Sequence, residues 1–252
     1  MRIKKIEEFV DGPGESALDV SKIPIVRWLA IIAFVLVAIG ISSQAYLYAA
    51  TPATGLRLIR LFDLDQENNI PSYFSAILLF LAFLFTAIVA FVKARRKDRF
   101  RFHWATLGIL VLGASVDEAA SIHEILTETT RELLGADGVG YLYFAWVVPG
   151  MIFVTLAAIL FSRFVYHLPG PIRSQMVTAG IVFLGGAVGV EMLGGEHFEL
   201  WGPRNFTFAA YCAAEESMEM AGVLLYIRAI LAQLRMSGEN IRLRFGDSST
   251  SS

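Results

Sequence analysis

Six long apolar runs constrain this chain more than any other feature of its sequence. Each is long enough to cross a bilayer as a helix, which takes roughly 20 residues. We place the runs near residues 25–49, 72–93, 103–126, 141–165, 175–195 and 206–233. Hydrophobic residues make up 56% of the chain and charged residues 17%, a balance that excludes a soluble domain and a disordered chain. We therefore predict an all-α, polytopic integral membrane protein that folds as a six-helix transmembrane bundle.

The Lys and Arg residues of the short loops predict how the bundle is oriented. They gather after the second run, between Lys93 and Arg101, and they also follow the fourth run and the last run. Cytoplasmic loops carry an excess of Lys and Arg, so six spans put these loops and both termini in the cytoplasm. We predict a cytoplasmic segment at 1–23, a transmembrane domain at 24–235 and a disordered cytoplasmic tail at 236–252. The membrane is expected to be a bacterial-type inner (plasma) membrane.

The connection after the first run has a pattern of its own. Its polar residues Arg57, Arg60, Asp63 and Glu67 recur at helical spacing, and mostly apolar residues lie between them. This pattern predicts either a helix over residues 56–67 on the outer membrane surface or an ordinary connecting loop.

Three of the runs carry acidic residues at membrane depth. An ionised acid at the bilayer centre costs about 2.5–3.5 kcal/mol, so these side chains should face one another or a wet cavity. The third and fifth runs lead outward and the sixth starts outside, which places all of the acids in the outer half of the bilayer. If the third run is one continuous helix, Asp117, Ser121 and Glu124 share a stripe on it. We expect the third, fifth and sixth runs to pack around one acidic pocket.

The acids of this pocket lack a basic partner in the sequence. Lys does not occur after Lys97, and Arg163, Arg204 and Arg228 lie near span ends or in loops. The acids must then stay protonated or be neutralised by a cation. Carboxylates with an imidazole suit Ca²⁺, Mn²⁺, Fe²⁺ or Zn²⁺. We predict a divalent metal site with candidate ligands Asp117, Glu118, His123, Glu124, Glu191, Glu215, Glu216 and Glu219.

Two other functions would use the same pocket. One is a membrane-embedded metalloenzyme acting on a lipid or quinone-like substrate, and the other is a channel or transporter that moves protons or cations along the carboxylates. The remaining alternative is purely structural, in which the acids only form hydrogen bonds between the helices. The single Cys212 excludes a disulfide framework, and a net charge of −2 offers no surface for nucleic acid. The expected partners are the lipid bilayer and a metal ion or protons, and a homo-oligomer is compatible with the sequence.

Overall fold

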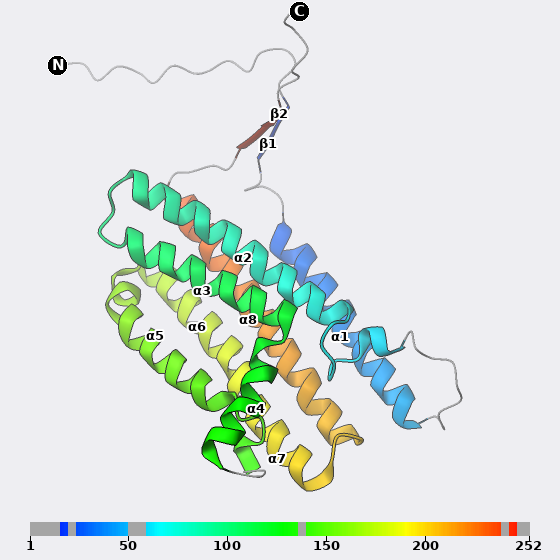
Figure 1. Ribbon diagram of the computed structural model, residues 1–252. Coiled ribbons are helices and arrows are strands. Elements are labelled where there is room, and N and C mark those ends of the chain that lie inside the picture. The colour runs from blue at the N-terminus through cyan, green and yellow to red at the C-terminus, as the bar shows by residue number, and fades with distance from the viewer. Residues whose placement is uncertain (1–15, 20–23, 50–58, 136–139, 238–241, 246–252) are drawn as a thin grey trace, which may run out of the picture.

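Helix α8 runs through the centre of a helical bundle, and the other long helices lie around it (Figure 1). The computed structural model describes residues 16–19, 24–49, 59–135, 140–237 and 242–245. In chain order the elements are strand β1 (Ser16–Asp19), helix α1 (Ile25–Ala49), 3-10 helix η2 (Ile59–Phe62), α2 (Ile70–Arg95), α3 (Arg101–Ala120), α4 (Ile122–Leu134), 3-10 helix η3 (Gly140–Leu142), α5 (Val147–His167), α6 (Gly170–Leu184), the π-helical segment η4 (Gly185–Val190), α7 (Glu191–Trp201), α8 (Phe206–Met236) and strand β2 (Arg242–Phe245).

Five helical segments are long and apolar enough to cross a bilayer. Helices α3 and α4 pass the same test only as a bent pair, which would bring the number to six. Large apolar side chains on the outside of the bundle, such as Phe34 and Leu156, are 74% and 62% exposed, as contact with lipid requires. These helices indicate a membrane protein with five to six spans. The five segments are Ile25–Tyr46, Ile70–Arg95, Val147–His167, Gly170–Trp201 and Phe206–Met236.

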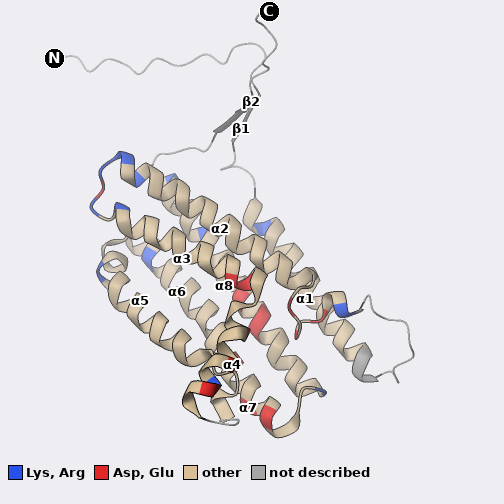
Figure 2. Ribbon diagram, viewed as in Figure 1, with Lys and Arg blue, Asp and Glu red and all other residues tan. Residues whose placement is uncertain are grey.

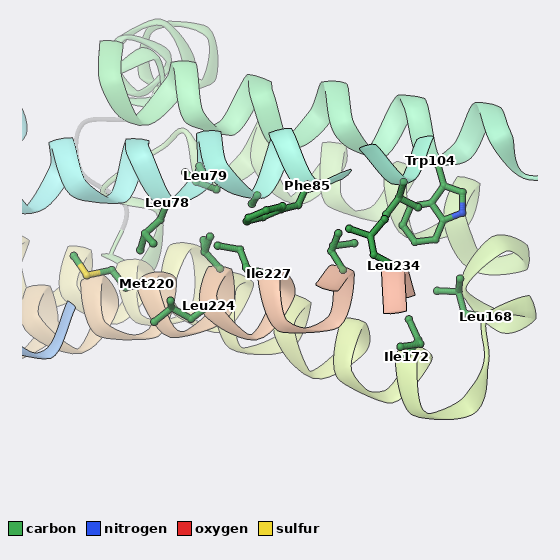
Figure 3. Close-up of a cluster of buried hydrophobic side chains, with 14 of the residues drawn as sticks. Leu78, Leu79, Phe85, Trp104, Leu168, Ile172, Met220, Leu224, Ile227 and Leu234 are labelled. Atoms are coloured by element: carbon green, nitrogen blue, oxygen red, sulfur yellow. The ribbon is translucent and has the colours of Figure 1, made fainter. Parts of the chain in front are cut away.

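The apolar core lies mainly between α2 and α8, with smaller contributions from α3, α5 and α6. Trp104 of α3 and Ile227 of α8 are among its fully buried side chains. Leu78, Phe85 and Leu224 reach into the same cluster from α2 and α8 (Figure 3). This core holds α8 against α2, and the same helix carries acidic residues nearer its N-terminus.

Charged residues separate along the bundle (Figure 2). Lys and Arg gather at the end where α2 turns into α3, which we call the basic end and define by residues 93–101. Asp and Glu lie near the middle of the bundle and toward the other end, where α4 and α7 are found. We call that end the acidic end. The basic turn is fixed by a salt bridge of 3.1 Å between Lys93 and Asp98.

Two helices of the bundle are interrupted at the acidic end. Ser121 takes a left-handed backbone conformation with a φ of 52°, and α4 leaves α3 there at an angle of 83°. The prediction of one continuous helix through Ser121 is therefore wrong, and Asp117 and Glu124 do not share a helical stripe. Helix α6 passes through η4 into α7, and such π segments are frequent at functional sites.

The connections outside the bundle also have described structure. Within residues 56–67 the helical part is Ile59–Phe62, a single 3-10 turn, and residues 56–58 lie outside the described part of the chain. From Asp63 the chain turns back toward α2. Near the ends of the chain, β1 pairs antiparallel with β2, so part of the predicted C-terminal tail is paired.

Candidate functional site

Many of the acidic side chains of the bundle line one cavity of about 190 Å³ at the acidic end. It lies between α3, α4, α7 and α8 and the chain segment that precedes α2. All of the candidate residues predicted from the sequence line this single cavity, although helix α3 does not continue as expected. They are Asp117, Glu118, His123, Glu124, Glu191, Glu215, Glu216 and Glu219.

The structure adds two carboxylates that sequence reasoning missed. Asp65 and Glu67 line the same cavity, which brings its carboxylates to nine. Both come from the segment for which a surface helix or a loop was predicted. A signal for them exists in the sequence, because Asn69 and Pro71 mark the start of α2. In antiparallel neighbours the start of α2 and the end of α3 lie at the same depth, so Glu67 falls near Asp117.

His123 joins two of these carboxylates. Its Nδ1 lies 3.2 Å from Oδ2 of Asp117, and its Nε2 lies 3.0 Å from Oε1 of Glu67. Because each ring nitrogen faces a carboxylate, the imidazole donates to both of them when it is protonated. The ring also packs on Trp146 with a centroid distance of 5.3 Å. These contacts hold the loop before α2 against α4.

The break at Ser121 makes this arrangement. A continuous helix would carry His123 up the same cylinder as Asp117, where the two side chains point in different directions. After the break, the backbone N–H of His123 donates to Oδ1 of Asp117 at 2.9 Å. Asp117 thus places a negative charge at the start of α4, where the helix dipole favours it.

Glu191 enters the cavity from the first turn of α7. Its Oε1 accepts a hydrogen bond of 3.0 Å from Nε1 of Trp146, and Glu215 of α8 lines the same cavity. Carboxylates that share a cavity need their charge compensated, and either a proton or a cation can do so. The approach of the two helices depends on Gly186. A methyl group added there would lie 2.9 Å from the backbone oxygen of Glu215.

The loop that carries Asp65 and Glu67 is tied down at both ends. The Oδ1 of Asn69 accepts the N–H of Ser72 at 3.0 Å, and the hydroxyl of Ser72 accepts the N–H of Asn69 at 3.1 Å, which together form a capping box for α2. Gln44 of α1 donates to Oδ1 of Asp63 at 2.9 Å. Desolvation by the surrounding cavity walls, although the side chain still reaches solvent at the mouth, and the neighbouring Asp63 raise the pKa of Asp65 to about 6.

The cavity runs from an open mouth to a buried floor. Asp65 and Glu124 are exposed at the mouth, whereas Glu216 and Glu219 are half-buried farther along α8. Glu219 lies eight residues after Tyr211, which is about 12 Å of helix rise. The Oε2 atoms of Glu216 and Glu67 are buried without a hydrogen-bond partner. Among the described residues, neither Lys nor Arg lines the cavity.

The described side chains do not yet form a closed coordination shell. In the described ranges, 16–245 with their gaps, no group of three His, Cys, Asp or Glu residues is placed to hold a metal ion. The site as it stands is a collection of carboxylates that surrounds a cavity. An ion would have to draw several of them inward.

Comparisons with known proteins place most of the chain in one family and assign it no activity. Residues 28–234 match a family described as a domain of unknown function (DUF8692). The match includes all of the cavity residues. No curated protein and no solved structure matches the chain.

Proposed function

We propose, for a chain that belongs to the DUF8692 family, that its acidic cavity binds a divalent cation within the membrane. One observation carries this proposal. Nine carboxylates and one imidazole line a single cavity, and neither Lys nor Arg is among its described lining residues.

Charge compensation is the physical reason. An ionised acid at membrane depth costs about 2.5–3.5 kcal/mol if it is left alone. When protonated, His123 supplies one positive charge, and its two ring nitrogens face Asp117 and Glu67. The remaining carboxylates need protons or a cation. The buried, unpartnered Oε2 of Glu216 is a free acceptor that such an ion would satisfy.

The geometry favours a hard cation with oxygen ligands. Both nitrogens of His123 already face carboxylates, so this ring positions Asp117 and Glu67 better than it serves as a ligand. Glu191 and Glu215 line the cavity from the neighbouring helices α7 and α8, and they are the natural first pair to bridge an ion. Oxygen-only sets suit Ca²⁺ or Mn²⁺ better than Zn²⁺. Glu side chains are long, and rotation about their bonds would complete the shell.

We further propose that the chain crosses an inner (plasma) membrane six times with both termini in the cytoplasm. The bent pair α3–α4 then counts as one span. The support is the concentration of Lys and Arg at the basic end, which the positive-inside rule places in the cytoplasm. The acidic cavity would face the outer side.

Elemental analysis of the detergent-purified protein tests the cation site. The wild-type chain is compared with the double variant Asp117→Asn/Glu215→Gln, and with Glu128→Gln/Glu132→Gln as a matched control. Glu128 and Glu132 are exposed on α4 and do not line the cavity. We expect about one or two ions per chain in the wild type and the control, and loss of the ion in the cavity variant.

Absence of metal from the wild-type protein, also after incubation with Ca²⁺ or Mn²⁺, would refute the cation site. Equal metal content in all three proteins would place the ion elsewhere in the chain. Iron or zinc in place of calcium or manganese would contradict the oxygen-only ligand set and favour the metalloenzyme alternative.

Proton translocation is the second candidate, and one observation favours it. The carboxylates that line one cavity, Glu191 and Glu215 among them, must hold protons when no ion compensates their charge. Proteoliposomes that carry a pH-sensitive dye would report proton flux. Flux that Glu215→Gln abolishes in a metal-free protein would support this function over cation binding.

A further inference from the structure

A second cavity of about 380 Å³ lies between α3, α5, α6 and α8 and is almost wholly apolar. Its volume falls in the roughly 300–1,000 Å³ range of ligand pockets. The only side-chain hydroxyl of its described lining belongs to Tyr226, and that oxygen lies 2.8 Å from Oγ1 of Thr86. We call this cavity the apolar chamber. It offers a ligand no free polar group.

The apolar chamber adjoins the acidic cavity. Leu79, Ala114 and Phe183 line both. On α8 the lining of the acidic cavity ends at Glu219 and that of the chamber begins at Gly222, about 4.5 Å of helix rise later. A molecule that fills the chamber would therefore end at the floor of the acidic cavity.

Small residues keep the chamber open. A methyl group added to Gly180 of α6 would meet no atom within 4 Å, and Ala157 of α5 lines the same space. Gly222 differs, because a methyl group there would lie 2.6 Å from Cβ of Phe183. Gly222 thus serves close packing, whereas Gly180 borders empty space.

The outer rim of the chamber faces the membrane side of the bundle. Phe153 of α5 and Val177 of α6 line it and are 56% and 43% exposed. An empty apolar cavity forfeits dispersion contacts along its walls, and apolar cavities do not hold water. Hydrocarbon is the material that surrounds these helices and fits this lining.

We infer that the apolar chamber binds one hydrocarbon chain of a membrane lipid and brings the polar end of that lipid to the acidic cavity. Binding of the chain goes beyond the cation site and does not depend on it. Only the placement of the polar end beside an ion rests on the proposed function. The ligand class is a lipid with a long linear chain and a small polar group.

Native mass spectrometry of the detergent-purified protein, titrated with 1-palmitoylglycerol, a lipid with one linear chain and a small polar group, tests the inference. The variants Gly180→Leu and Ala157→Leu fill the chamber from two helices. Gly113→Leu is the matched control, because a methyl group at Gly113 also meets no atom within 4 Å but this residue does not line the chamber. We expect both chamber variants to bind the lipid about tenfold more weakly, or ~1.4 kcal/mol, and the control to bind like the wild type.

Equal binding by the chamber variants and the control, or no bound lipid in the wild type, would overturn the inference. Thermal unfolding of each variant is the control for folding: a variant whose melting temperature equals that of the wild type has not lost lipid binding through misfolding. The Asp117→Asn/Glu215→Gln variant separates the two proposals. If this variant binds the lipid but no metal, both sites are supported. If the wild-type protein binds the lipid but takes up no metal, the lipid site stands and the cation site is refuted.

Discussion

Gly186→Ala tests how the fold builds the acidic cavity. Gly186 lies in the π segment η4, opposite α8. Its added methyl group would stand 2.9 Å from the backbone oxygen of Glu215 and 3.0 Å from Cβ of Met218, whereas ordinary contacts begin at 3.4 Å. The helices must therefore separate by about 0.5 Å, the difference between 3.4 and 2.9 Å. Backbone atoms of α8 cannot rotate away as the end of a side chain can.

The expected cost follows from this overlap. Overpacking of a well-packed site costs about 1–3 kcal/mol. Replacing a helical glycine by alanine gains roughly 0.5–1 kcal/mol, which acts in the opposite direction. Gly189→Ala supplies the matched control, because it lies in the same π segment and its added methyl group meets no atom within 4 Å. The difference between the two variants isolates the steric cost.

Thermal unfolding in detergent measures that difference. We expect Gly186→Ala to melt below Gly189→Ala, by about 2–4 °C for each kcal/mol of steric cost. A shift of the α8 backbone at Glu215 also moves one side of the acidic cavity, so we expect Gly186→Ala to bind the cation more weakly than Gly189→Ala. Equal melting temperatures and equal cation affinities of the two variants would refute the argument that Gly186 sets the position of Glu215.

Three further changes test the loop and the His123 contacts. Asp65→Asn should stabilise the protein more at pH 7.5 than at pH 4.5. The pKa of Asp65 is raised to about 6, so its ionised form opposes folding as the pH rises through that value; equal effects at both pH values would contradict this. Asn69→Ala removes the capping box and should lower the free energy of unfolding by about 1 kcal/mol in denaturation measurements, whereas an unchanged value would show that the cap is dispensable. His123→Gln removes the contacts of the imidazole ring with Asp117 and Glu67. A hydrogen bond to a charged group is worth about 1.5–3 kcal/mol, so we expect a lower melting temperature. A melting temperature equal to that of the wild type would argue against the bridging role.

Much of the membrane domain follows from the sequence because hydropathy is a local property. The run at 25–49 coincides with α1, and the run at 206–233 lies within Phe206–Met236. The free-energy cost of placing a charged side chain in the membrane led to the second prediction, that the acids meet in one pocket. Acids such as Asp117, Glu191 and Glu215 share one cavity, since carboxylates at membrane depth have few other places to go.

Local signals did not predict the break in the third run. Ser121 is neither Gly nor Pro, yet it adopts a left-handed conformation that a single sequence does not announce. The break is held by contacts of Asp117 with the backbone and ring of His123. These contacts exist only when α4 has turned away from α3.

A helical membrane protein whose acidic side chains need their charge neutralised can be predicted from the sequence alone. Both conclusions rest on the free energy of transferring each side chain from water into the membrane, which is a local property of the chain. Tertiary structure decided which groups meet. It brings Glu67 from a loop to His123, and it opens an apolar chamber beside Glu219. Contacts between residues that are distant along the chain depend on how helices pack, and close approaches such as that of Gly186 to Glu215 decide that packing.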